Sequence, residues 1–327
     1  RLGGGGGVGE VLVEPLAELG AERLGPLVVG QPHSPPVAAS NTDVSVASAF
    51  VALVSLDALL AALDPVEASP GRWRAPHLDL DHHRIFGGQL LAQAIAVAAA
   101  TGEGKVVKSI SCLFPREGDA DRPIELVVER PHDGRTFAAR RITGTQDGKA
   151  FFLADVSLHD AEPGLVHQAA MADVRAPGDG GPEAATAAWL SLVPWETRIV
   201  DGADLADRKQ GPASFAFWSR VGDRALPDDP AVHQALLAHA TDLTVIGTAL
   251  RPHAGYSQAD AGTLLVTAVT SHSLWFHQPF RLDDWCLVAQ HCPITAGGRG
   301  FGLGHVFDAA GRLVASFAQE SMIRVAT

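Results

Sequence analysis

Charged residues, cysteines and long apolar runs are all scarce in this 327-residue sequence. Charged residues make up 19% of the chain and hydrophobic residues 46%, a balance typical of a compact soluble protein and not of a disordered one. The apolar runs stop short of the ~18 residues that a membrane-spanning helix needs, and residues 2–13 lack the charged-then-apolar order of a secretory signal. We therefore expect a cytoplasmic protein without a membrane partner.

The shortage of basic residues and of cysteines argues against further classes. The formal net charge is −12, whereas broad nucleic-acid binding requires a basic face, so no nucleic-acid partner is predicted. The three cysteines, Cys112, Cys286 and Cys292, are odd in number and lack the paired spacing of a metal site. We expect them to be reduced, buried thiols, and we predict neither a metal nor a cofactor.

Changes in composition divide the chain into four segments. Residues 1–50 combine a glycine run with a Pro/Ser-rich stretch and are predicted to form a flexible extension. Residues 161–190 are rich in Pro, Gly, Ala and acidic residues, which is typical of a linker. Residues 51–160 and 191–327 are then the predicted N-terminal and C-terminal domains.

Each of these two domains is predicted to contain one buried helix followed by antiparallel strands. The runs Leu90–Ala100 and residues 231–250 are apolar on nearly every side, and a helix without a polar face belongs inside a protein. Asp242 is the conspicuous charge in the second run. Ser55 caps a shorter helix at residues 56–63. Segments that read as strands lie at residues 71–78, 106–159, 195–200, 215–221 and 263–323.

The two domains repeat the same local patterns in the same order. Gly134-Arg135-Thr136-Phe137 recurs as Gly298-Arg299-Gly300-Phe301, and each is followed by a glycine-basic turn and a closing strand. This repetition predicts one unit, an antiparallel meander around a helix, used twice. The predicted fold class is therefore α+β.

The repetition lets one half serve as a control for the other. Alternation in the closing strand places Gln319 on the apolar face, where counting from the paired glycines matches it to Val156 of the first half. A buried amide without partners costs roughly a few kcal/mol, so we expect Gln319 to have polar partners or a functional role. Asp242 is expected to have a raised pKa, which suits a general base, although a structural carboxylate that caps a turn is the alternative. The layer that Asp242 shares with Gln319 favours the functional interpretation.

Other polar residues receive less specific interpretations. Ser271, His272 and Asp242 would form a hydrolase triad, but no nucleophile turn accompanies them, and we interpret His272 and His277 as structural. The two histidines also lack the spacing and the partners of a metal site. Arginines near turns either contact a phosphate-bearing ligand or remain solvated, and the second reading is favoured for Arg135, Arg140, Arg141 and Arg299.

Four motifs, in order along the chain, resemble the acyl-CoA thioesterase II family. They are Phe86-Gly87-Gly88-Gln89, the run from Gly134 to Arg141, the run from Ser273 to Phe280 and Ala318-Gln319-Glu320. The resemblance covers about residues 52–324 and implies a double hot-dog fold, in which two antiparallel sheets each wrap a long central helix. It agrees with the duplication.

The resemblance also implies site residues. In the family an aspartate, a hydroxyl residue and a glutamine hold a water, and the first and third fall on Asp242 and Gln319. The hydroxyl position falls on Val269, which has no hydroxyl; the adjacent Thr270 faces the other way in a regular strand, and only a bulge would turn it inward. Substrate contacts are predicted at Gly87, Gly88, Gln89 and Arg299.

The resemblance implies hydrolysis of an acyl-CoA to a free fatty acid and CoA, a reaction of lipid metabolism. Asp242 would take a proton from a water oriented by Gln319, with backbone N–H groups at a helix end holding the oxyanion. A non-catalytic acyl-CoA-binding protein on the same fold is the main alternative, kept open by Val269. A hydratase or dehydratase would show an Asp and a His a few residues apart in a loop that contains Asn-Pro, and this sequence lacks such a loop. A secreted hydrolase with a catalytic triad is the remaining alternative. We also expect a homo-oligomer, because exposed sheet edges favour assembly.

Overall fold

The computed structural model describes residues 54–80, 82–178, 194–200, 202–222 and 224–326. The predicted extension at residues 1–50, and residues 179–190 of the predicted linker, lie outside the described residues. The helices are α1 (Leu56–Ala62), α2 (Gly87–Ala100), α3 (Pro230–Thr241), α4 (Val245–Leu250) and the 3-10 turn η2 (Gln258–Asp260). The strands are β1 (Val66–Ser69), β2 (Arg72–Ala75), β3 (Val106–Leu113), β4 (Ile124–Asp133), β5 (Phe137–Gln146), β6 (Lys149–His159), β7 (Glu196–Ile199), β8 (Ser214–Arg220), β9 (Leu265–Phe276), β10 (Cys286–Ala296), β11 (Arg299–Asp308) and β12 (Leu313–Val325).

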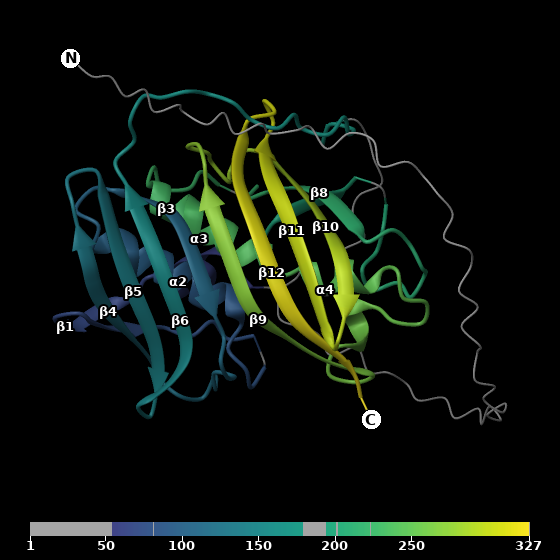
Figure 1. Cartoon of the computed structure of the whole chain (residues 1–327), viewed down its shortest axis with the longest axis horizontal. Helices are drawn as coiled ribbons and strands as arrows, with labels where there is room; N and C mark the ends of the chain where they lie inside the picture. Colours follow the sequence, from purple (N-terminus) through teal and green to yellow (C-terminus); the bar gives the residue numbers. More distant parts are fainter. Residues whose placement is uncertain (1–53, 81, 179–193, 201, 223, 327) are drawn as a thin grey trace, which may run out of the picture. The chain divides into compact units, whose positions relative to one another are not determined.

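All twelve of these strands belong to one antiparallel sheet, in the order β1-β2-β4-β5-β6-β3-β9-β12-β11-β10-β8-β7 (Figure 1). The order is symmetric about the β3–β9 pair: β4, β5 and β6 on one side of it match β10, β11 and β12 on the other. The structure thus confirms the duplication. The two predicted sheets are joined edge to edge, because β3 and β9 pair from Ser109–Trp275 to Leu113–Ser271.

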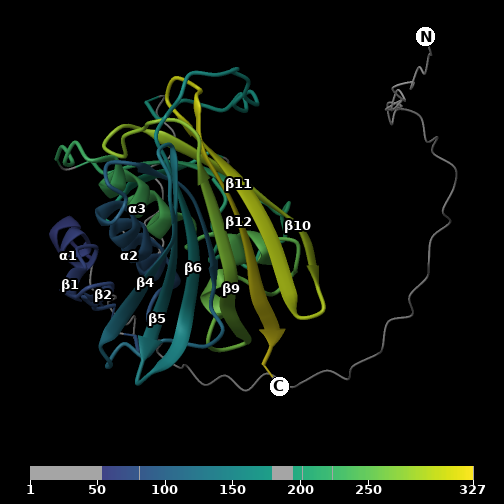
Figure 2. The same cartoon turned by 60° about the vertical axis from the view of Figure 1, so that its left-hand side comes forward.

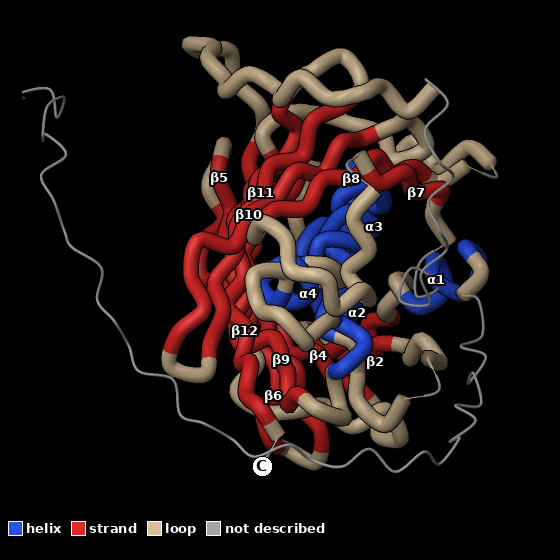
Figure 3. The backbone as a smooth tube through the Cα atoms, turned by 90° about the vertical axis from the view of Figure 1, so that its right-hand side faces the viewer, coloured by secondary structure: helices blue, strands red, loops and turns tan. Residues whose placement is uncertain are grey.

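Helices α2, α3 and α4 lie on one face of the sheet, which we call the inner face (Figures 2 and 3). The start of α2 lies against the end of α3, since a Cβ atom added at Gly88 would be 2.6 Å from the backbone oxygen of His239. Strand residues directly opposite each other share a face, so burial identifies the inner positions. Among the described residues, no helix has both the length and the apolar character needed to cross a membrane.

The second buried helix is shorter than predicted, because it breaks at residues 242–244 and resumes as α4. Three hydrogen bonds that involve Gln258 and Gln290, two residues outside the helix, stabilise the break and the start of α4. The Gln258 side chain donates to the backbone oxygen of Leu243 at 3.0 Å, and the Thr244 hydroxyl donates to Gln290 at 2.9 Å. Gln290 in turn donates to the Thr248 hydroxyl at 2.6 Å. Asp242 therefore occupies the C-terminal end of α3 instead of its interior.

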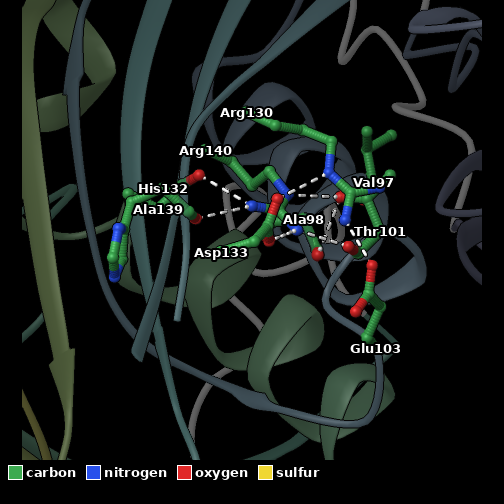
Figure 4. Close-up of polar contacts among 9 residues, drawn as sticks. All are labelled: Val97, Ala98, Thr101, Glu103, Arg130, His132, Asp133, Ala139 and Arg140. Atoms are coloured by element: carbon green, nitrogen blue, oxygen red, sulfur yellow. Dashed lines mark hydrogen bonds and ion pairs between the residues drawn. The ribbon is translucent and has the colours of Figure 1, made fainter. Parts of the chain in front are cut away.

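The corresponding helix of the first half ends differently (Figure 4). The side chain of Arg140, fully buried, donates to the hydroxyl of Thr101 at 3.0 Å, to its backbone oxygen at 2.5 Å and to Asp133 at 2.6 Å. A cation is favoured at the negative C-terminal end of a helix dipole. The expectation that Arg140 is solvated or meets a ligand phosphate is therefore wrong, because its guanidinium is already bonded at the end of α2.

The described part of the predicted linker, residues 161–178, has no regular secondary structure. Met171 and Val174 pack against Trp218, Leu287 and Phe307, a small cluster apart from the main core. Leu287 and its neighbour Val288 lie on opposite faces of β10, and Val288 belongs to the main core. Residues 171–174 thus cover part of the outer face of the second half.

Candidate active site

Asp242 lies where the end of α3 meets the start of α2. The Gly88 backbone N–H donates a hydrogen bond to its carboxylate. Gly87 allows the close approach, because a Cβ atom there would be 2.7 Å from Asp242 Oδ2. The other oxygen, Oδ1, is buried and has no hydrogen-bond partner among the described residues. The predicted contact residues Gly87 and Gly88 are thus brought to Asp242.

Burial controls the protonation of this carboxyl group. Removal from water raises the pKa of Asp242 to about 7, and the hydrogen bond from Gly88 opposes the rise. The position at the C-terminal end of α3 also exposes the carboxylate to the negative end of that helix dipole. A carboxyl group that titrates near neutrality, with one unpaired oxygen, is suited to accept a proton from a bound water.

His272, which we interpreted as structural, proves to be part of the same site. Its ring is fully buried, with Nδ1 2.9 Å from Gln319 Oε1 and 3.6 Å from Asp242 Oδ1. Burial lowers the pKa of His272 to about 4, so the ring is neutral and its approach to Asp242 is not an ion pair. Nε2 lies 3.2 Å from the hydroxyl of Thr241, the residue before Asp242.

Gln319 is held at both ends of its amide, as a buried amide requires. Since Oε1 is an acceptor, the neutral His272 donates through Nδ1–H, and Gln319 Nε2 donates to the Ser321 hydroxyl at 2.9 Å. In the first half the equivalent strand position is Val156, opposite Ile110, whereas Gln319 lies opposite His272. The predicted difference between the halves is therefore present in their inner faces.

A bulge in β9 decides which residues reach this inner face. The register with β12 runs from Glu320–Ser271 to Ser321–Val269 and skips Thr270. Val269 consequently faces inward opposite Ser321, which is 1% exposed. The hydroxyl of Thr270 donates to the Glu320 backbone oxygen at 3.0 Å. The bulge that we considered exists, but it keeps Val269 on the inner face and does not turn Thr270 inward.

The side chains of two other predicted site residues have partners other than Asp242. Gln89 is buried, with its amide bonded to the Leu78 N–H at 3.1 Å and the Pro76 oxygen at 3.0 Å, so it anchors the preceding loop. Arg299 forms a 3.0 Å ion pair with Glu320, and its side chain is 62% exposed on the outer face of the sheet. The side chains of Gln89 and Arg299 are thus bonded to groups other than the carboxylate.

The alternative triad is excluded by the strand geometry. Ser271 lies opposite Glu320 and faces outward, whereas His272 faces inward opposite Gln319. Their side chains therefore lie on opposite faces of the sheet, and Ser271 is no nucleophile for His272. His277 is exposed, and its Nε2 lies 2.9 Å from the Ser316 hydroxyl. Within the ranges that the structure describes, no group of three or more His, Cys, Asp or Glu is placed to hold a metal ion.

Two further buried residues lie beside the site: His239, which was not singled out from the sequence, and Cys112, which was predicted only as a buried thiol. His239, one turn before Asp242, is fully buried, and neither ring nitrogen has a partner among the described residues. Burial lowers its pKa to about 3. Cys112 lies directly opposite His272 in the β3–β9 pair. Burial, and next the charge of Asp242, raise the pKa of the Cys112 thiol, so it is not a nucleophile near neutrality.

Two family models match this chain, one in each half. A model described as acyl-CoA thioesterase N-terminal domain matches residues 76–159, and one described as acyl-CoA thioesterase matches residues 198–322. Human acyl-coenzyme A thioesterase 8 is 30% identical over 284 residues, which cover 80% of this chain and 87% of the human protein. The chain belongs to the acyl-CoA thioesterase family. The predicted resemblance is confirmed.

Other members of the thioesterase family are similar along nearly their whole length. Acyl-CoA thioesterase 2 of Haemophilus influenzae is 31% identical, covering 77% of this chain and 92% of that protein. The crystal structure of the acyl-CoA thioesterase II TesB2 of Mycobacterium marinum superposes with a TM-score of 0.70 at 32% identity, covering 82% of this chain and 99% of that one. An Alicyclobacillus acidocaldarius protein with a hot dog fold, 17% identical with a TM-score of 0.66, supports the fold alone. The predicted double hot-dog fold is confirmed.

Proposed function

We propose that this thioesterase hydrolyses acyl-CoA with a water molecule bound between Asp242 and Gln319. The observation that carries the proposal is the unpaired Oδ1 of Asp242, buried beside the His272–Gln319 pair and titrating near neutrality. A buried acceptor without a protein partner costs free energy. A water that donates to Oδ1 would recover that cost and would be oriented for reaction.

The ionised form of Asp242 is the form that starts the reaction. Oδ1 accepts a proton while the water oxygen forms a bond to the thioester carbonyl carbon. The resulting tetrahedral oxyanion collapses, the carbon–sulfur bond breaks, the thiolate of CoA takes up the proton from Asp242, and the fatty acid and CoA leave. A thiol has a pKa of about 8.5, so its thiolate departs with little acid assistance. The backbone N–H of Gly87, in the first turn of α2, is the donor that we assign to the oxyanion.

In this proposal His272 is a positioning residue. It is neutral throughout the working pH range, because burial lowers its pKa to about 4. Its Nδ1–H holds Gln319 Oε1, and its distance of 3.6 Å from Asp242 Oδ1 keeps that oxygen available to water. A charged imidazolium at this place would pair with Asp242 and lower the basicity of the carboxylate.

The test is free-thiol release from short, medium and long acyl-CoAs by the wild type and by Asp242→Asn. The amide keeps the size of the carboxylate but cannot accept a proton in this way, so we expect a loss of about 10²–10⁴-fold in kcat. Ser271→Ala, on the outer face, is the matched control and should retain activity. Equal rates for the wild type and Asp242→Asn would contradict the assignment of the base.

A binding protein without catalysis remains the second candidate, since the inner position of Val269 supplies no hydroxyl. It predicts tight acyl-CoA binding without thiol release by the wild type. The same panel, combined with calorimetric titration of acyl-CoA, separates the two functions.

Two finer properties are part of the proposal. The described cysteines are free and buried, which favours a reducing, cytoplasmic environment. We also propose a homo-oligomer, because Leu113 and Trp275, on the central strands, are 56% and 42% exposed. Sedimentation velocity at several concentrations tests the second property, and a monomer throughout would contradict it.

A further inference from the structure

We propose that Ser321 supplies the site hydroxyl that Val269 cannot supply. This inference rests on the proposed function, and it identifies a further residue that contacts the attacking water. The resemblance places a hydroxyl on β9, whereas the structure places one on the facing strand β12. The two positions are directly opposite, because Ser321 and Val269 are partners in the β9–β12 register.

The contacts of Ser321 fit this role. Its hydroxyl oxygen accepts a 2.9 Å hydrogen bond from Gln319 Nε2, and the residue is 1% exposed. Nothing among the residues that the structure describes accepts the Ser321 hydroxyl hydrogen, just as nothing donates to Asp242 Oδ1. A buried hydroxyl normally uses its hydrogen. A water that accepts from Ser321 and donates to Asp242 would satisfy both groups.

Thr270 is the rival source of a hydroxyl, and its contacts argue against it. Its hydroxyl donates to the backbone oxygen of Glu320 at 3.0 Å and lies 3.5 Å from the Glu320 carboxylate. Glu320 alternates with the inward-facing Gln319 and Ser321, so its side chain is on the outer face. The bulge thus places the Thr270 side chain on the outer side of the strand, whereas Ser321 supplies an inner hydroxyl that contacts Gln319.

The experiment compares two substitutions of equal shape. Ser321→Thr keeps the hydroxyl, and Ser321→Val replaces it with a methyl group, so both add the same bulk to the inner face. We expect kcat for acyl-CoA hydrolysis to be about 10–100-fold lower for Ser321→Val than for Ser321→Thr. KM should differ by less than about twofold between them. Equal kcat values would overturn the inference.

A rescue experiment distinguishes the loss of the hydroxyl from a packing defect at residue 321. Ser321→Ala should lower kcat by a similar factor, and adding Val269→Thr should restore at least about tenfold by returning a hydroxyl to the facing position. A loss caused by packing alone would not be rescued in this way, and an unrescued Ser321→Ala would count against the inference. Thr270→Val should stay within about twofold of the wild type, whereas a loss equal to that of Ser321→Ala would assign the hydroxyl to Thr270.

Failure of this inference is distinguishable from failure of the proposed function. Asp242→Asn tests the base independently of any hydroxyl. If Asp242→Asn is inactive while Ser321→Val is as active as Ser321→Thr, the function stands and the assignment of Ser321 falls. If Asp242→Asn is fully active, both fall together.

Discussion

Oδ1 of Asp242 lies 3.6 Å from Nδ1 of His272, beyond the range of a good hydrogen bond, although both side chains are fully buried. Nδ1–H is instead directed to Gln319 at 2.9 Å. The carboxylate is thus close to a polar neighbour but does not bond to it. Burial raises the pKa of Asp242, and the separation from His272 leaves Oδ1 as a free acceptor.

The first prediction concerns the pH dependence of the reaction. Burial raises the pKa of Asp242 to about 7 and lowers that of His272 to about 4. The active form has the carboxylate ionised and the imidazole neutral. A plot of log(kcat/KM) against pH should therefore rise with a slope of one below about pH 7 and level off above it. Stopped-time thiol release between pH 5 and 9 measures the profile. A flat profile across pH 6–8 would be inconsistent with Asp242 as the base.

The second prediction concerns stability, which should depend on Asp242 in the opposite sense from activity. The folded-state pKa of about 7 lies above the ordinary value of 3.8, so the folded state binds the proton more tightly. The contribution is complete below pH 3.8 and is lost as the pH rises through 7. The difference of about 3 units corresponds to about 4 kcal/mol.

Asp242→Asn removes this titration. Relative to the wild type, its free energy of unfolding should increase by up to about 4 kcal/mol between pH 4 and pH 8. Urea unfolding of both proteins at several pH values measures the difference, in which the other titrating groups, including His239 and His272, cancel to first order. A difference that does not change with pH would show that the carboxyl group titrates normally in the folded state.

The sequence predicts the framework of this protein better than the details of its site. Apolar periodicity locates α2 and the meanders, because a helix without a polar face and strands of period two depend on local pattern. Duplication isolates Gln319 by comparison with Val156. Both predictions use information that is local or repeated within the chain.

The features that sequence analysis misses depend on contacts distant along the chain. The break after α3 interrupts an apolar run that reads as continuous, and Gln258 and Gln290 stabilise it from other elements. The inward direction of His272 follows from the β9 register, which is fixed by pairing with β12 and contains a bulge at Thr270. A bulge of one residue reverses the faces of the strand, so alternation alone could not assign His272 to the site.

The third prediction uses the glycine that borders the carboxylate. A Cβ atom at Gly87 would lie 2.7 Å from Asp242 Oδ2 and 3.3 Å from the Phe114 ring, so Gly87→Ala must displace the carboxylate. A displacement of about 1 Å costs on the order of 100-fold in rate, while alanine in place of glycine slightly favours the helix. We expect a large loss of kcat with unfolding stability changed by less than about 2 kcal/mol.

Two other glycines provide controls for this substitution. A Cβ atom at Gly88 would meet the Phe86 ring at 2.5 Å and the backbone oxygen of His239 at 2.6 Å, so Gly88→Ala should disturb helix packing and lower stability by about 1–3 kcal/mol or more. Gly164 has no atom within 4 Å of an added Cβ, and Gly164→Ala should be silent. If Gly87→Ala retains wild-type kcat, the carboxylate position is not critical.

The fourth prediction distinguishes the positioning role of His272 from a role as base. His272→Phe keeps an aromatic ring but leaves Gln319 Oε1 without its donor, and we expect kcat to fall by about 10–100-fold. His272→Asn places an N–H group near the position of Nδ1 and should retain more activity than His272→Phe. His277→Phe, at an exposed position, is the control and should stay near wild type.

The pH profiles of these variants show whether His272 or Asp242 is the base. Because His272 is already neutral above pH 5, its replacement by asparagine should leave the rise near pH 7 in place, at a lower plateau. The rise belongs to Asp242, so only Asp242→Asn should remove it. If His272→Asn abolishes the rise while Asp242→Asn preserves it, the imidazole is the base, and the roles of the two residues must be exchanged.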